Sequence, residues 1–165
     1  RLIQTIEAFA RSKVKAHLTI YGFGPLERVA KNLVRARLIT KRVTFRGRVP
    51  HNELLQIFAN ADVVMQTSIG FETQGLTVYE SLAVGTPVLL CDPKIASELP
   101  KKTYWLDKSG TIKSLSKTIK KAVEDISEQS NKRELLEDPT WLLQSALTQK
   151  MIETYKQLIA QKQAK

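Results

Sequence analysis

The chain has 165 residues, of which 42% are hydrophobic, 25% are charged and 7% are aromatic, and its formal net charge is +10. This composition is typical of one globular domain with a hydrophobic core, and it excludes a disordered chain, a small disulfide-stabilised fold and a membrane-spanning helix, which needs an apolar run of roughly 18 residues. The lone Cys91 has no disulfide partner within the chain, so we expect a reducing, cytoplasmic compartment in which Cys91 is a buried strand residue.

Short β-rich segments alternate with helical patterns through the first hundred residues, and helical patterns follow them. In chain order, the predicted elements are a helix at Leu2–Phe9, a strand at Ala16–Tyr21, a helix at Leu26–Leu38, a strand at Val43–Phe45, a helix at Leu54–Ala61, a strand at Val63–Gln66, a helix at Leu76–Val84, strands at Val88–Cys91 and Thr103–Leu106, and helices at Ile112–Ile126 and Thr140–Gln161. Ile152 and Tyr155 are among the apolar residues of the last helix that could face a core.

The repetition of strand, turn and helix predicts right-handed βαβ units. Several strands are continuous apolar runs, as a sheet covered on both faces requires. The predicted fold class is therefore α/β, with a Rossmann-like parallel sheet and helices on both faces. Residues 1–165 contain no repeat, low-complexity tract or Gly/Ser linker, so we expect a single domain. The pattern opens with a helix, although the first strand of a doubly wound sheet is usually central, so we expect a fragment of a longer protein.

Positive charge is concentrated in the first part of the chain. Residues 1–50 contain twelve Lys and Arg and two Glu, whereas residues 51–100 contain one Lys and six acids. Nucleic acid, an anionic membrane surface and a phosphorylated ligand are three partners that such charge permits. Nucleic acid is the weakest of them, because no recognised DNA- or RNA-binding module is present. One predicted helix face carries Arg28, Lys31 and Arg35, either as a solvated face or as a surface for an anionic membrane or acceptor.

The segment 61–90 predicts an anion site at the start of a helix. A predicted strand ends near Thr67, and a polar loop leads into the helix that begins near Leu76. The first N–H groups of a helix lack intrahelical acceptors and carry partial positive charge, which suits a diphosphate. Gly75 allows unusual backbone angles and the close approach of a ligand. The amides expected to face the ligand belong to Gln74, Gly75, Leu76 and Thr77.

Two carboxylates flank this helix start. Glu72 lies in the loop before the helix and Glu80 lies in its first turns, so the two side chains can face one pocket from two sides. Carboxylates accept hydrogen bonds from vicinal hydroxyls, and they repel a phosphate, so their targets are a ribose and a sugar ring. On their own, two glutamates at this spacing are also explained by helix capping or by solvation.

Residues 72–88 read ETQGLTVYESLAVGTPV and resemble the E-x7-E signature of retaining glycosyltransferases of the GT-B fold, in particular glycosyltransferase family 4, which typically show E-x-F-G-L-x-x-x-E-A-x-A-x-G-x-P-V. Residues 20–26, IYGFGPL, resemble the family's strand-ending G-x-G-P turn. Residues 43–49, VTFRGRV, and the Ala-Asp-Val at 61–63 match its F-x-G-x-V and A-D-V segments. The match covers roughly residues 1–100, and four motifs in order are specific together.

The resemblance implies a role for each matching position. The two catalytic glutamates would bind hydroxyls, Glu80 those of the donor ribose and Glu72 those of the transferred sugar. The amides of residues 74–77 would hold the sugar and the diphosphate. The remaining donor-binding positions are Arg48 and Val49, whose backbone would face the base, and Gly22 and Gly24, which would leave room for the nucleotide. The resemblance implies no cofactor and no metal.

The sequence also departs from the family pattern. Gln74 replaces the usual Phe, Ser81 replaces the usual Ala, and the usual Gly-Gly is missing after the strand, although Glu98 matches a glutamate of that region. The family's Gly-Arg and Lys pair would lie upstream of Arg1, so we expect this fragment to bind the donor weakly and not to catalyse. His51, which follows a proline in a turn, is interpreted as a solvated or capping residue rather than a base.

The leading hypothesis is the donor-binding domain of a retaining hexosyltransferase that uses a UDP-sugar and acts on a glycolipid or polysaccharide acceptor. The expected partners are the donor, an N-terminal acceptor domain of the parent chain and an anionic membrane surface, at the inner face of the cell membrane. A non-catalytic glycosyltransferase-like interaction module is the alternative. A dinucleotide-dependent oxidoreductase is excluded, because Gly22-Phe23-Gly24 lacks the third glycine of that fingerprint.

Overall fold

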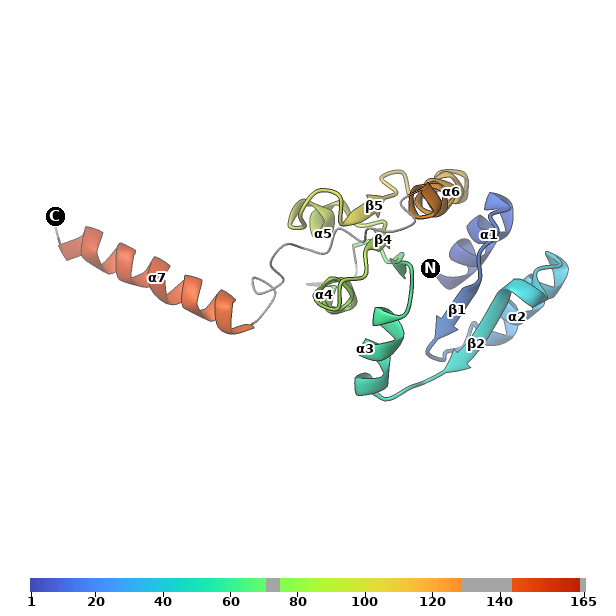
Figure 1. Cartoon of the computed structure of the whole chain (residues 1–165), viewed down its shortest axis with the longest axis horizontal. Coiled ribbons are helices and arrows are strands. Elements are labelled where there is room, and N and C mark those ends of the chain that lie inside the picture. The colour runs from blue at the N-terminus through green and yellow to red at the C-terminus, as the bar shows by residue number, and fades with distance from the viewer. Residues whose placement is uncertain (71–74, 129–143, 164–165) are drawn as a thin grey trace.

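The computed structural model describes residues 1–70, 75–128 and 144–163, and Figure 1 shows the arrangement of its elements. In chain order these are α1 (Leu2–Ser12), β1 (Leu18–Tyr21), α2 (Glu27–Ala36), the 3-10 helix η1 (Thr40–Arg42), β2 (Val43–Gly47), α3 (His51–Ala59), β3 (Val64–Gln66), α4 (Leu76–Ala83), β4 (Val88–Leu90), α5 (Pro93–Ser97), β5 (Tyr104–Leu106), α6 (Ile112–Glu128) and α7 (Gln144–Gln163). Each predicted strand and helix is present, with shifted ends.

Two helix starts differ from the sequence prediction, and both follow from proline. Helix α3 begins at His51 rather than Leu54, directly after Pro50, whose extended backbone (ψ 148°) makes it the residue before the first turn. Helix α5 was not predicted. Its start is fixed by Pro93 in the first turn and by Asp92, whose side chain accepts a hydrogen bond from the N–H of Lys94 at 2.9 Å.

The five strands pair in parallel but form two sheets. One sheet has the order β1-β2, with Leu18 opposite Val43, and the other has the order β3-β4-β5, with Val64 opposite Val88. Within the described ranges no strand lies between β1 and β3, so each pairs along one edge only. The predicted α/β fold, with parallel strands and helices on both faces, is confirmed. Its described strands form two sheets rather than one, and the division lies between β1 and β3.

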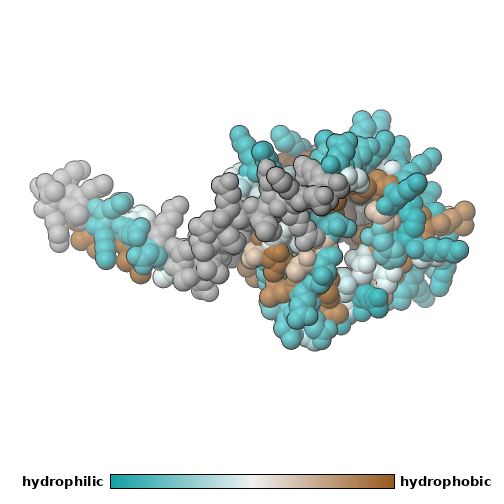
Figure 2. Space-filling view, in the orientation of Figure 1, coloured by the Kyte–Doolittle hydropathy of each residue, from teal (hydrophilic) through white to brown (hydrophobic). Residues whose placement is uncertain are grey.

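The C-terminal helix α7 extends away from the rest of the described structure (Figure 1). Figure 2 shows apolar side chains along one side of it, and Ile152 and Tyr155 are 42% and 59% exposed. The prediction that these two residues face a core is therefore wrong, because both side chains are exposed in the described structure. None of the described helices is both long enough and apolar enough to cross a membrane.

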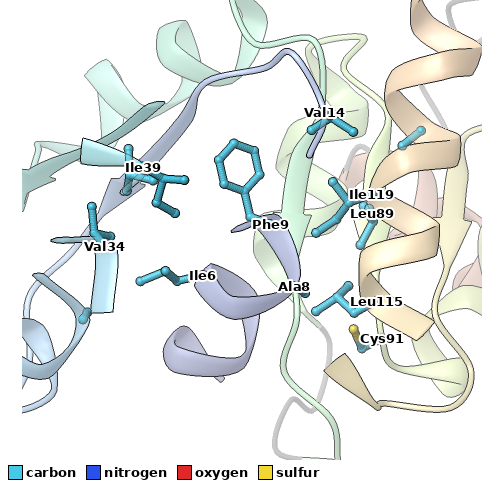
Figure 3. Close-up of a cluster of buried hydrophobic side chains, with 13 residues drawn as sticks. Ile6, Ala8, Phe9, Val14, Val34, Ile39, Leu89, Cys91, Leu115 and Ile119 are labelled. Atoms are coloured by element: carbon cyan, nitrogen blue, oxygen red, sulfur yellow. The ribbon is translucent and has the colours of Figure 1, made fainter. Parts of the chain in front are cut away.

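Alternate residues of the central strand β4, and Cys91 directly after it, belong to two separate cores. Leu89 and Cys91 pack with helices α1, α2 and α6, whereas Val88 and Leu90 pack with α3, α4 and α5. Because side chains alternate along a strand, these two sets of helices cover opposite faces. On the face covered by α1, α2 and α6, helix α1 packs across both sheets. In Figure 3 the side chain of Ile6 lies toward Val34 of α2, and Ala8 lies beside Leu115 of α6.

Candidate functional site

The start of helix α4 depends on a glycine. Gly75 precedes the helix with φ 61° and ψ 50°, a left-handed conformation that costs an ordinary residue about 1 kcal/mol or more. A Cβ built on Gly75 would lie 2.7 Å from Cδ1 of Ile95 in α5, so a side chain here would also collide with the neighbouring helix. Glycine at this position therefore suits the backbone conformation, and a Cβ here would require the Ile95 side chain to shift.

Helix α4 begins without a side-chain cap among the described residues. It has eight residues, and in the same part of the chain no hydrogen-bond acceptor is recorded for the N–H of Leu76 or of Thr77. The Leu76 side chain is 64% exposed and Thr77 is half-buried, whereas Gly75 is buried beside Ile95, so this end of the helix is only partly covered. An uncapped helix start with exposed donors can bind an anion. Glu72 and Gln74 lie outside the described residues, so their predicted roles stay predictions.

Glu80 faces a histidine that the sequence analysis set aside. Its carboxylate Oε1 lies 3.7 Å from Nε2 of His51, and the two side chains are 27% and 66% exposed. His51 is the first residue of α3 and not its cap, because Pro50 holds the cap position. The only sequence signal was Pro50, which places a helix start directly after β2; the pairing with Glu80 joins segments that follow strands of separate sheets.

Asp92 ties together the ends of β3 and β4. It is 4% exposed and accepts hydrogen bonds from the N–H of Gly70 and of Lys94, each at 2.9 Å. The hydrogen bond from Gly70 is the largest cause that holds the pKa of this carboxyl below its usual value, with further backbone bonds acting in the same direction against the effect of burial. Asp92 therefore anchors the loop that leads toward α4, a role that the sequence analysis missed.

The predicted residues near the ends of β1 and β2 form a second group. The N–H of Gly22, at φ 107°, donates to the carbonyl of Gly47 at 2.7 Å. A Cβ on either Gly22 or Gly24 would meet no atom within 4 Å, so both positions leave open space. Arg48 is exposed and Val49 is half-buried in the segment before α3. This segment runs directly into His51, which joins the second group to Glu80.

Glu98, the position that matched a family glutamate, is paired with a tyrosine of α4. The Tyr79 hydroxyl donates to Oε2 of Glu98 at 2.6 Å. Burial, followed by this hydrogen bond to the glutamate, raises the pKa of Tyr79 to about 12. This pair fastens α4 to the end of α5. Among the described residues, no three His, Cys, Asp or Glu side chains gather as a metal site.

Comparison with known proteins agrees with this geometry. Residues 1–138 match the family described as glycosyl transferases group 1. The chain therefore belongs to this family of glycosyltransferases. The finer assignment to glycosyltransferase family 4, and the reading of Glu72 and Glu80 as its E-x7-E motif, stay predictions. No curated protein matches the chain.

Two solved structures resemble the fold over nearly the whole chain. Sucrose-phosphate synthase from Thermosynechococcus elongatus has a TM-score of 0.69 and 24% identity, and the match covers 97% of this chain and 43% of that one. The pneumococcal O-GlcNAc transferase GtfA, solved in complex with UDP and GlcNAc, has a TM-score of 0.60 and 16% identity, with 96% and 32% covered. The chain thus spans less than half of either protein, and the likeness shows a fold shared with GT-B glycosyltransferases.

Proposed function

We propose that this chain is the donor-binding domain of a retaining glycosyltransferase that moves a hexose from a UDP-sugar to a glycolipid or polysaccharide acceptor. The observation that carries the proposal is the start of α4, which has no side-chain cap among the described residues and has Glu80 on the same helix. Membership of the glycosyltransferase family supports it, as does the similarity to a transferase solved with UDP and GlcNAc.

Each part of this site has a distinct task in the proposal. The N–H groups of residues 74–77 bind the diphosphate, because a helix start carries partial positive charge. Glu80 accepts hydrogen bonds from the ribose hydroxyls, and Glu72 accepts them from the sugar. The backbone at Arg48 and Val49 contacts the base, beside the open space at Gly22 and Gly24. His51 limits the conformations of Glu80 through its contact at 3.7 Å.

Transfer then needs no nucleophile from this chain. The acceptor hydroxyl attacks the anomeric carbon on the face from which the diphosphate leaves, so the bond to the diphosphate oxygen breaks as the new glycosidic bond forms. A diphosphate oxygen takes the proton of the hydroxyl. Catalysis rests on positioning and on stabilising the negative charge that develops on the leaving group.

The proposal places the acceptor-binding half, and one further strand, upstream of this chain in the parent protein. Among the described residues, β1 and β3 each have one edge without a strand partner, which supports the proposal of a further strand because parallel strands in α/β folds are normally paired on both sides within a covered sheet. On this view the 165-residue chain binds the donor but does not complete the reaction alone.

Titration of the chain with UDP and with UDP-glucose, followed by amide NMR, tests the proposal. We expect the amide signals of Gly75, Leu76 and Thr77 to shift first, and Glu80→Gln to weaken binding about tenfold because a charged hydrogen bond is lost. Glu124→Gln, an exposed glutamate of α6 paired with Lys120, is the matched control. Shifts confined to other regions, or equal binding by the Glu80 variant, would contradict the proposal. ADP and GDP in parallel titrations decide the base.

A further inference from the structure

A row of cations lies on the solvent-facing side of helix α2. Arg28, Lys31 and Arg35 are exposed, and helical geometry places them within an arc of about 60° around the helix axis. Along the axis, Lys31 lies about 4.5 Å from Arg28 and about 6 Å from Arg35. The stretch 28–52, which contains this row, has eight Lys and Arg and no Asp or Glu. Three positive charges therefore follow one line along the most cationic part of the chain.

These cations line an open groove of about 460 Å³ together with a carboxylate and an amide. The carboxylate belongs to Glu27, in the first turn of α2, and the amide belongs to Asn32. A carboxylate accepts hydrogen bonds from hydroxyl groups, and an amide both donates and accepts them, whereas Lys and Arg side chains only donate. The groove therefore offers cations for anionic groups and, beside them, polar groups for hydroxyls.

The positive charge of the groove is only partly neutralised. The Lys31 amine lies 2.6 Å from the Glu27 carboxylate and 5.6 Å from the ring centre of the phenylalanine in β2, so two contacts hold it in place. The Arg35 guanidinium donates to the neutral side-chain oxygen of Asn32 at 3.1 Å. Among the described residues, neither Arg28 nor Arg35 has an ion-pair partner. These two guanidinium groups are the charges that an anionic ligand would meet.

One end of the groove adjoins the proposed donor site. Gly24 and Pro25, in the turn after β1, belong to its lining. Gly24 is also one of the positions to which the proposal assigns the nucleotide, and a Cβ there would meet no atom within 4 Å. A ligand in the groove therefore lies next to the space assigned to the donor and extends along α2, which the proposed function leaves without a role.

We propose that this groove, named here the α2 groove, binds an acidic oligosaccharide, that is, a sugar chain that carries carboxylates. Arg28 and Arg35 bind the carboxylates, to which the planar guanidinium group is matched in shape and charge. Glu27 and Asn32 form hydrogen bonds with the sugar hydroxyls. The choice of a saccharide rests on the proposed function, in which the acceptor is a glycolipid or a polysaccharide; the new elements are its negative charge and its place along α2.

Other anions fit the α2 groove less well. A single-stranded nucleic acid is bound through aromatic side chains on which its bases stack, and none lines the groove among the described residues. A polyphosphate would place its charge against the Glu27 carboxylate without offering that carboxylate a hydroxyl. A lipid surface is not favoured, because the exposed apolar residues Leu26 and Val29 project from other sides of the helix than the row of cations.

Calorimetric titration of the 165-residue chain with trigalacturonate, a linear trimer of an acidic sugar, tests the proposal. The neutral trisaccharide maltotriose, tripolyphosphate and a DNA oligonucleotide are titrated in parallel. We expect trigalacturonate to bind most tightly of the four. Its binding should weaken about tenfold in Arg28→Gln/Arg35→Gln, because each exposed ion pair contributes about threefold. Lys113→Gln/Lys117→Gln removes the same charge from exposed positions of α6 and is the matched control, which should bind trigalacturonate as the parent chain does.

Three results would overturn the proposal. The first is equal loss of trigalacturonate binding in the α2 and α6 variants, because the loss would then reflect net charge alone. The second is binding of maltotriose, tripolyphosphate or DNA that is as tight as that of trigalacturonate. The third is no measurable binding of trigalacturonate by the parent chain. Circular dichroism and thermal unfolding verify that α2 remains folded in each variant.

Parallel titrations with UDP separate this proposal from the proposed function. Arg28→Gln/Arg35→Gln should keep the UDP affinity of the parent chain, and Glu80→Gln should keep its affinity for trigalacturonate. Binding of UDP without binding of trigalacturonate would refute only the α2 groove, whereas binding of trigalacturonate without binding of UDP would refute only the donor site.

Discussion

The imidazole of His51 lies 3.7 Å from the carboxylate of Glu80, which joins the first residue of α3 to the middle of α4. The two helices follow different strands, β2 and β3, that belong to separate sheets. This contact is therefore a polar link between the two halves of the candidate site, and it places an imidazole beside the carboxylate that the proposal assigns to the donor ribose.

Replacing His51 with alanine should weaken donor binding more than it changes stability. The pair is largely exposed, so its contribution to the free energy of unfolding is about 1 kcal/mol or less. We expect a several-fold increase in the dissociation constant for UDP, measured by calorimetry, because Glu80 loses its orienting neighbour. Asn52→Ala, at the next exposed position of α3, is the control. Unchanged UDP affinity in the His51 variant would show that Glu80 is oriented by its own helix.

Gly75→Ala should destabilise the fold by about 2 kcal/mol, because the new Cβ meets Ile95 and the left-handed backbone disfavours alanine. Chemical denaturation measures the difference. Gly24→Ala, where a Cβ meets nothing within 4 Å, should cost much less.

The two causes at Gly75 can be separated by shortening its neighbour. Ile95→Val removes the Cδ1 atom and should recover part of the loss in the double variant, leaving the backbone penalty. Purely additive effects of the two substitutions would mean that the collision with Ile95 contributes nothing.

Asp92→Asn should lower stability at neutral pH by about 1 kcal/mol, since Asp92 accepts backbone hydrogen bonds as an anion from Gly70 and Lys94. The pKa of Asp92 in the folded protein lies below its ordinary value of 3.8. Its stabilisation is therefore fully present above about pH 4 and is lost as the pH falls through the lowered pKa. The difference in unfolding free energy between parent and variant should shrink in acid. Asp62→Asn, at an exposed position, is the control.

Cys91 should resist alkylation while the chain is folded. Its thiol is 1% exposed, and burial, followed by the nearby charge of Asp107, raises its pKa to about 11. Both effects keep the thiol protonated and inaccessible at pH 8, and the thiolate is the reactive form. Labelling with iodoacetamide should therefore require urea and follow the global unfolding curve. Rapid labelling in buffer would show that β4 and its surroundings open locally.

The sequence predicted the order of strands and helices well, because apolar periodicity survives in each segment. It predicted Cys91 as buried, which is confirmed, although β4 itself ends one residue earlier at Leu90. Helix α5 was missed because its five residues are too few to show a period, and its start depends on the cap at Asp92. The core role expected of Ile152 and Tyr155 was wrong, since a periodic pattern does not say which surface, if any, a helix packs against.

Within the candidate site, the positions that depend on local backbone geometry were the most predictable. The unusual conformation of Gly75 could be expected from its place before a helix. The contacts of Glu80 with His51, and of Asp92 with Gly70, join segments 29 and 22 residues apart, and no local pattern encodes such pairs. Glu72 and Gln74 lie outside the described residues, so their predicted contacts await the donor-binding experiment.

In the described structure, helix α1 provides the connection between the two sheets that paired strands provide in a continuous sheet. No backbone hydrogen-bond ladder links β1 to β3, so the two halves of the described structure are fastened across α1 chiefly by close-packed side chains such as Ile6 and Phe9. Dispersion and burial lack the directionality of a ladder, so small sliding of one half past the other is less costly than bending either sheet. Such sliding would change the distance between Arg48 and the start of α4, to which the proposal assigns the nucleotide base and the diphosphate.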